Sequence, residues 1–236
     1  MYFTAKRLFP SHLRYFHSSL RQNNLISVLY RLSELDTIIF DLGEVIVDLD
    51  PKAVIDEFSR LTDGRGKNLR ELIVGSPYLF EYETGQIDDH EFIRQINQLF
   101  QSEISYDEFF HAWNLMIKSI PENRLELMKK LQQTHRVLVL SNTNRMHEVK
   151  FEKMMMDTAN ITMRELADMA YYSHDIGRRK PNADIYEFVI DEQSLNPEKS
   201  LFLDDKKENI EAARTVGLKA EQVQFPDQIF DILSHE

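Results

Sequence analysis

The stretch TIIFDLG, residues 37–43, decides the fold, because a short apolar run ends there in a carboxylate. The β-branched and aromatic residues 37–40 are typical of a strand buried in a parallel sheet. Asp41 follows the run at once, and Gly43 would let the backbone approach a ligand closely beside that carboxylate. Taken alone, such an aspartate is more often a turn former or a helix cap than a catalytic group. Its meaning therefore depends on the residues that the fold brings to it.

Three further runs of this kind predict the rest of a sheet, namely Arg136–Leu140, Met169–Ser173 and Ser200–Leu203. Helical patterns alternate with these runs. The alternation favours an α/β fold, a doubly wound Rossmann-like parallel sheet, in which ligands bind beyond the carboxyl ends of the strands. Polar side chains gather at those ends, and they are Ser141, Asn142, Asp204 and Asp205.

Residues 51–123 have helical patterns and no comparable strand. Helices are predicted near Ala53–Leu61, Asp88–Phe100 and Tyr106–Ile117. Asp88 and Ser105 are expected N-caps, since Glu91 and Glu108 stand three residues later at capping-box spacing. We therefore expect a helical cap over residues 51–123, inserted into a core formed by residues 36–50 and 124–236.

Residues 1–35 form a basic leader in a chain whose formal net charge is −11. Its acid-poor composition resembles an organellar transit peptide. We favour the alternative of a poorly ordered or surface-docked leader that adds nothing to the chemistry. The sequence thus predicts a cytoplasmic protein, with organellar targeting as the lesser alternative. The basic residues of this segment are Lys6, Arg7, Arg14, Arg21 and Arg31, against the single acid Glu34.

The composition excludes several classes of function. The acidic balance argues against a general nucleic-acid binder, which needs clustered Lys and Arg, and no run approaches the roughly 18 apolar residues of a membrane span. The chain has no cysteine, which excludes disulfides, thiolate metal sites and cysteine nucleophiles, and its eight histidines show no convincing ligand spacing. We expect no nucleic-acid or membrane partner, a monomer or weak homo-oligomer, and metal chemistry carried by carboxylates.

The carboxylates at the strand ends suit a hard cation. Asp204 and Asp205 would repel each other unless a cation or a proton compensates. Mg²⁺ typically uses one or two carboxylates plus substrate phosphate, which fits Asp41 and Asp205 with Asp204 in support. Asp41 could also act as a covalent nucleophile in phosphate transfer. The structural alternative makes Asp204 and Asp205 an N-cap pair for a helix near Glu208–Val216, and both roles can coexist.

A phosphate group also needs hydrogen-bond donors, which Ser141, Asn142 and Lys180 could supply. Ser141 and Asn142 are equally ordinary turn residues. Lys180 is more informative, because its cation could neutralise phosphate and restrain the crowded carboxylates. Pro181 follows it and can occupy the first turn of the next helix.

The order of these motifs, from Thr37 to about Phe225, resembles the haloacid dehalogenase superfamily. The similar motifs are residues 39–45, 140–144, 177–181 and 203–210. The resemblance implies that Asp41 attacks phosphorus and that Ser141 and Lys180 hold the phosphate. It also implies that Asp204 and Asp205 serve Mg²⁺, to which Gly43 could offer its carbonyl.

The helical insert resembles the small cap of this family, and residues 83–87, ETGQI, look like its Glu-x-Gly turn. The DLG motif is similar to that of the bacterial alpha-D-glucose-1-phosphate phosphatases, which implies a small phosphorylated metabolite, a sugar phosphate, as substrate. Tyr82, Glu83 or Trp113 could line the cap side of the pocket, although a buried aromatic is more often part of the core.

One departure from the family bears on turnover. Most of its phosphatases carry an acidic general acid/base where this chain has Gly43, a group worth roughly 10² to 10⁴-fold. None of the next acids, Glu44, Asp48 and Asp50, can be assigned in its place. The leading hypothesis is Mg²⁺-dependent phosphomonoester hydrolysis through an aspartyl-phosphate on Asp41. The alternatives are a catalytically impaired phospho-ligand-binding protein and a haloacid dehalogenase.

Overall fold

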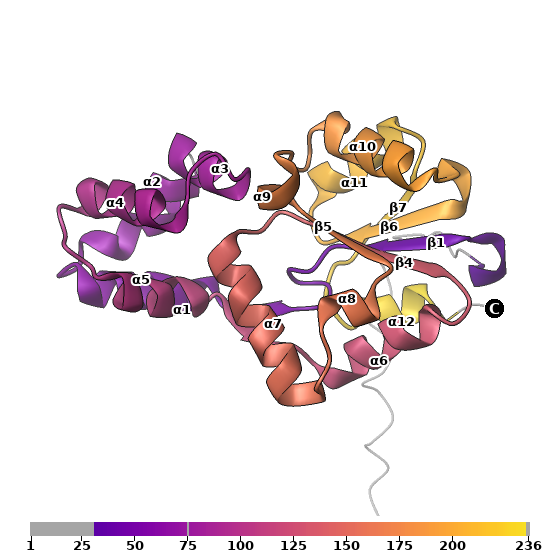
Figure 1. The fold of residues 1–236 in the computed structure, drawn as a ribbon, viewed down its shortest axis with the longest axis horizontal. Coiled ribbons are helices and arrows are strands. Elements are labelled where there is room, and N and C mark those ends of the chain that lie inside the picture. Colours follow the sequence, from indigo (N-terminus) through magenta and orange to yellow (C-terminus); the bar gives the residue numbers. More distant parts are fainter. Residues whose placement is uncertain (1–30, 75, 235–236) are drawn as a thin grey trace, which may run out of the picture.

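The computed structural model describes residues 31–74 and 76–234, so most of the basic leader and its targeting prediction lie outside the described residues. The core is a five-stranded sheet in the order β5-β4-β1-β6-β7 (Figure 1). Every neighbouring pair is parallel, which confirms the predicted α/β class. The strands are β1 Thr37–Phe40, β4 Arg136–Ser141, β5 Met169–Tyr172, β6 Ser200–Asp204 and β7 Lys219–Gln222.

Helices cover both faces of this sheet (Figure 1), which explains why its central strands are continuously apolar. Ile38 and Phe40 pack on one face with residues of α6, α7 and α12, whereas Ile39 packs on the other with residues of α10 and α11. These helices are α6 Glu122–Leu131, α7 Arg145–Ala159, α10 Ala183–Gln193, α11 Lys207–Thr215 and α12 Gln228–Ile232. The shorter elements of the core are α8 Met163–Leu166, α9 Ser173–Ile176 and the 3-10 turns Leu32–Glu34 and Pro197–Lys199.

The strand order reverses at β1. The chain proceeds from β1 to β4 and β5 on one side, and then crosses to β6 and β7 on the other. Ligands of such sheets bind where the order reverses, beyond the carboxyl ends of the strands. Asp41 follows β1 at this point, while Ser141 and Asp204 end the two neighbouring strands.

The helical cap has its own apolar core and lies beside the sheet domain (Figure 1). A two-stranded antiparallel ribbon of β2 Asp48–Leu49 and β3 Ile117–Ser119 joins the two parts. The region 51–123, in which no strand comparable to those of the core is expected, contains β3, a three-residue strand too short to leave a pattern. The cap consists of α1 Pro51–Leu61, the 3-10 turn Arg65–Asn68, α2 Leu69–Val74, α3 Pro77–Glu83, α4 Asp89–Phe100 and α5 Tyr106–Asn114.

The predicted caps of α4 and α5 are confirmed, with one difference. Ser105 and Glu108 form a complete capping box. Asp88 accepts a hydrogen bond from the Glu91 backbone, but the Glu91 carboxylate turns to Arg94 and Gln95, so this box is not closed.

Among the described residues no helix has the length and apolar character that crossing a membrane requires.

Candidate active site

Three carboxylates meet at the carboxyl edge of the sheet. Asp41, Asp204 and Asp205 each present an oxygen within 4.8 Å of the others, and Asp41 and Asp204 are buried. The Asp41 backbone continues the hydrogen bonding between strands β1 and β6, since its N–H donates to the Leu203 carbonyl at 2.9 Å. The sheet therefore fixes where this carboxylate points. Ser141, also buried, ends the adjacent strand β4.

Lys180 bridges two of these carboxylates. Its Nζ lies 2.9 Å from Asp41 Oδ1 and 2.6 Å from Asp204 Oδ2, and it donates to the Leu140 carbonyl at 2.7 Å. The side chain is only 1% exposed. A buried ammonium is tolerated when opposite charges and hydrogen bonds surround it, so the pairing holds all three charged groups in place.

The Asn142 side chain contacts the backbone of Lys180. Its Nδ2 donates to the Lys180 carbonyl at 2.8 Å, and its Oδ1 accepts from the Lys180 backbone N–H at 2.9 Å. Both amide atoms thus hold the Lys180 backbone, and the phosphate contact of Asn142 stays a prediction. The prediction that Pro181 occupies the first turn of the next helix is wrong, because α10 begins at Ala183 with Asn182 as its N-cap.

Asp204 accepts hydrogen bonds from several groups that could not be predicted from the sequence pattern. The Asn209 amide donates to both carboxylate oxygens at 2.9 Å, and the Lys206 backbone N–H donates to Oδ1 at 2.8 Å. The N-cap residue of α11 is Lys206, so the alternative of an Asp204-Asp205 cap pair is wrong. Because both Asp204 oxygens accept hydrogen bonds from the protein, Asp204 orients Lys180. Asp205 is less constrained than Asp204.

Burial and the neighbouring charges shift the pKa values of the groups at the site. Burial raises the pKa of Asp41, with Lys180 opposing it and Asp204 adding to it. Burial, followed by the charges of Asp41 and Asp204, raises the pKa of Asp205 to about 6. Burial opposes the charge of Lys180, yet the carboxylates of Asp204 and Asp41 raise its pKa. Three carboxylates facing one ammonium leave an excess of negative charge on oxygen ligands, which suits a hard divalent cation.

The acids that follow Gly43 have structural partners. The Glu44 carboxylate accepts the Leu49 N–H at 3.2 Å. Asp48 is bound by Ser119 and Arg124, each at 2.6 Å, and Asp50 caps α1 through the Ala53 N–H at 3.0 Å. None of the three is placed to replace the missing acid/base beside Asp41.

The inner face of the cap contacts two loops of the site. Glu83 Oε2 lies 3.1 Å from Arg179, the neighbour of Lys180. Trp113 Nε1 donates to Asn144 Oδ1 at 3.3 Å, so the cap also rests on the loop after Ser141. Of the cap residues considered from sequence, Tyr82 and Trp113 are buried in the cap's apolar core.

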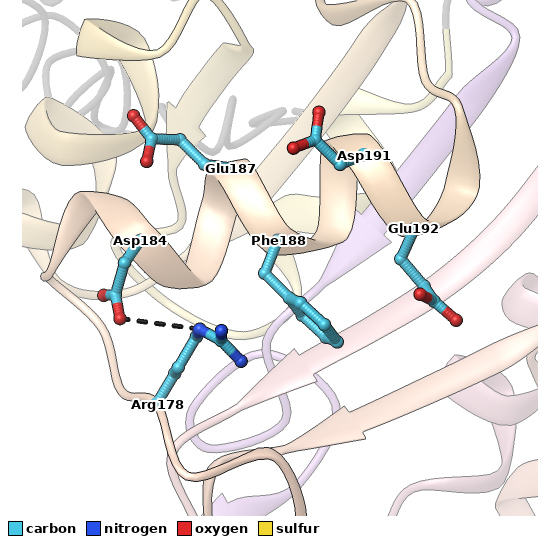
Figure 2. Close-up of a pocket in the computed structure, with 6 residues that line it drawn as sticks. All are labelled: Arg178, Asp184, Glu187, Phe188, Asp191 and Glu192. Atoms are coloured by element: carbon cyan, nitrogen blue, oxygen red, sulfur yellow. Dashed lines mark ion pairs between the residues drawn. The ribbon is translucent and has the colours of Figure 1, made fainter.

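A separate hollow of about 570 Å³ lies along α10 (Figure 2). Arg178 pairs there with Asp184 at 3.6 Å, and Figure 2 shows Glu187 and Asp191 on the side of the helix away from Arg178 and Phe188. These carboxylates diverge, so the hollow lacks the convergent groups found beside Asp41.

Known proteins are similar to this chain in sequence and in fold. A family model described as haloacid dehalogenase-like hydrolase matches residues 35–217. The D-ribitol-5-phosphate phosphatase of Bacteroides thetaiotaomicron is 26% identical over 188 residues, which are 80% of this chain and 91% of that protein. A crystal structure of a HAD family enzyme from the same organism, a magnesium complex, has a TM-score of 0.75 and 25% identity, covering 80% of this chain and 93% of that chain. A predicted HAD-like family hydrolase from Porphyromonas gingivalis has the same fold, with a TM-score of 0.75, 23% identity, and coverage of 84% and 94%.

Proposed function

Since the chain belongs to the haloacid dehalogenase-like hydrolases, we propose that it is a magnesium-dependent phosphatase of a small phosphorylated metabolite, with Asp41 as the nucleophile. The observation that carries the proposal is the convergence of Asp41, Asp204 and Asp205 around the buried Lys180. A carboxylate nucleophile, an ammonium and a set of oxygen ligands are the groups that phosphoryl transfer through a covalent aspartate requires.

The oxygen ligands fit Mg²⁺. We assign Asp41 and Asp205 as direct ligands with the Gly43 carbonyl, and Asp204 as the group that orients Lys180, because its oxygens already accept hydrogen bonds. Bound Mg²⁺ would stabilise the negative charge of the phosphoryl group. The magnesium complex of the 25% identical HAD enzyme supports this assignment.

The chain's own residues supply the attack. An Asp41 oxygen forms a bond to phosphorus as the bond to the leaving oxygen breaks, while Lys180 and Ser141 hold phosphate oxygens. Because Gly43 has no side chain, the leaving oxygen takes its proton from water. A second water then attacks the aspartyl-phosphate, which releases phosphate and restores the Asp41 carboxylate. The absence of an acid at position 43 should slow both proton transfers.

For the substrate we propose a sugar or polyol phosphate. The relative from Bacteroides thetaiotaomicron is named for D-ribitol 5-phosphate, which is a polyol phosphate ester. The two alternative functions make different predictions. A catalytically impaired binding protein would bind such esters without releasing phosphate, and a dehalogenase would release halide in the presence of a chelator.

Phosphate release from a panel of sugar and polyol phosphates tests the proposal. Wild-type protein should show multiple turnover with Mg²⁺ and none with excess chelator, and Asp41→Asn should abolish it. Asp36→Asn is the matched control, since Asp36 is an exposed acid just before β1. Release that survives either chelation or Asp41→Asn would refute the mechanism.

A further inference from the structure

Asn114, the last residue of α5, is a buried amide without partners. It is 4% exposed, and neither its Nδ2 nor its Oδ1 has a hydrogen-bond partner among the described residues. Burying an amide without hydrogen bonds costs free energy, and most buried polar groups in proteins are paired. A ligand that supplies both a donor and an acceptor would remove this cost.

The residues on either side of Asn114 contact the two loops that follow Ser141 and Asp41. Trp113 before it contacts Asn144 in the loop that follows Ser141. Its ring also stacks on His147, with ring centroids 5.4 Å apart. The position before Asn114 is therefore fixed against the loop at the end of β4.

The residues after Asn114 lead to the loop that follows Asp41. The Met116 carbonyl accepts the Asp50 N–H at 2.9 Å, and Ile117 pairs with Leu49. The Leu49 side chain in turn covers Gly43, since a Cβ built on Gly43 would lie 3.0 Å from Leu49 Cδ1. Asn114 thus lies on the chain that spans from the β4 loop to the nucleophile loop.

The cap contacts the core at two further points. Glu83 pairs with Arg179 at 3.1 Å. Gly85 packs so closely that an added Cβ would lie 2.2 Å from the His174 carbonyl oxygen. Asn114 is thus buried in a structure whose cap contacts the core.

We propose that Asn114 binds hydroxyl groups on the carbon chain of the substrate and makes the protein selective for polyhydroxylated phosphate esters. This inference rests on the proposed phosphatase function and names the group that chooses its substrate. Phosphate oxygens at pH 7 mainly accept hydrogen bonds and would satisfy only Nδ2, whereas hydroxyl groups both donate and accept and can satisfy Nδ2 and Oδ1 together. An ester without hydroxyls leaves the amide unpaired and is rejected.

Binding measurements test the inference independently of turnover. Isothermal titration calorimetry with Mg²⁺ would compare D-ribitol 5-phosphate with n-pentyl phosphate, which shares the primary alkyl ester but lacks hydroxyls. The protein carries Asp41→Asn so that neither ester is consumed. Adding Asn114→Ala should weaken binding of the ribitol ester on the order of ten- to a hundredfold and leave n-pentyl phosphate unchanged.

Gln95→Ala is the matched control, because Gln95 Oε1 is also buried without a partner but belongs to α4, where its Nε2 donates to Glu91 at 2.9 Å. This variant should keep the preference for the ribitol ester. The melting temperature without ligand should not fall in Asn114→Ala, since the deleted amide has no partner to lose. An unchanged ratio of the two affinities in Asn114→Ala overturns the inference. Absence of phosphate release by the wild-type protein instead overturns the proposed function.

Discussion

Replacing Lys180 by methionine removes the cation that separates two buried carboxylates. Met keeps the length and apolar stem of the side chain, so the change isolates the ammonium. Lys180 Nζ lies 2.9 Å from Asp41 and 2.6 Å from Asp204, and all three groups are buried. Removing one partner of a buried ion pair typically costs about 3–5 kcal/mol, because the remaining charge is left uncompensated. We expect a loss of this size in the free energy of unfolding at pH 8, together with loss of phosphate release.

The loss should depend on pH in a definite direction. Lys180 lowers the pKa of Asp41, which burial already raises, so its removal raises that pKa further. A carboxyl whose folded-state pKa exceeds its unfolded value binds protons in the folded state first. Stability therefore falls as the pH rises through this window, and is regained on acidification. The cost of Lys180→Met should be smaller at pH 5 than at pH 8.

Urea denaturation at both pH values, with and without Mg²⁺, measures these differences. Mg²⁺ should restore part of the stability at pH 8, since a ligand that binds only the folded state stabilises it. Lys199→Met is the control, because Lys199 makes an exposed ion pair with Asp36 at 3.5 Å and such pairs contribute about 0–1 kcal/mol. Equal losses for Lys180→Met at pH 5 and pH 8 would refute the reasoning.

Two further changes test the proton chemistry and the cap–core contact. Gly43→Asp should raise kcat by roughly tenfold or more, since an added Cβ meets only the side chain of Leu49, with Cδ1 at 3.0 Å and Cγ at 3.8 Å. An unchanged kcat in a folded variant would show that proton transfer does not limit turnover. Burial holds the pKa of His147 down to about 4, so the unfolded chain takes up a proton first and stability falls as the pH drops from about 6.5 toward 4, by at most about 3 kcal/mol. His147→Phe keeps the ring stacked on Trp113 and should flatten this dependence in thermal melts; parallel curves for the variant and the wild type contradict the assignment.

The sequence predicted the core strands β1, β4, β5 and β6 from their apolar runs and missed β7. β1 and β6 are continuous apolar runs because helices cover both sides. β7, with the sequence KAEQ, is an edge strand with a single buried residue, so it leaves no apolar run. The end of α5 was also placed too late, at Ile117, because the apolar residues after Asn114 turn into β3 instead of continuing the helix.

The convergence of the site residues could be predicted from the parallel arrangement of the strands. Asp41, Ser141 and Asp204 stand at the ends of neighbouring parallel strands, which must finish at one edge. The partners of the amides could not be predicted. Asn142 and Asn114 look alike in sequence, yet the Asn142 amide binds the Lys180 backbone through both its atoms, whereas the Asn114 amide has no partner among the described residues. Only the tertiary arrangement decides whether a buried amide is a structural group or a group left for a ligand.

The charges of the site separate binding from turnover. Three carboxylates and one ammonium leave two negative charges when all are ionised, which a divalent cation balances before a phosphate arrives. Binding and attack therefore depend on Asp41, Asp205 and Lys180, all of which are present. Departure of the leaving oxygen depends on a proton that position 43 does not supply. A leaving group that is itself acidic needs this proton less. The absence of an acid at position 43 should therefore favour substrates with acidic leaving groups. This preference is separate from the recognition of hydroxyls by Asn114. Gly43→Asp should accordingly help esters of poorly acidic alcohols most.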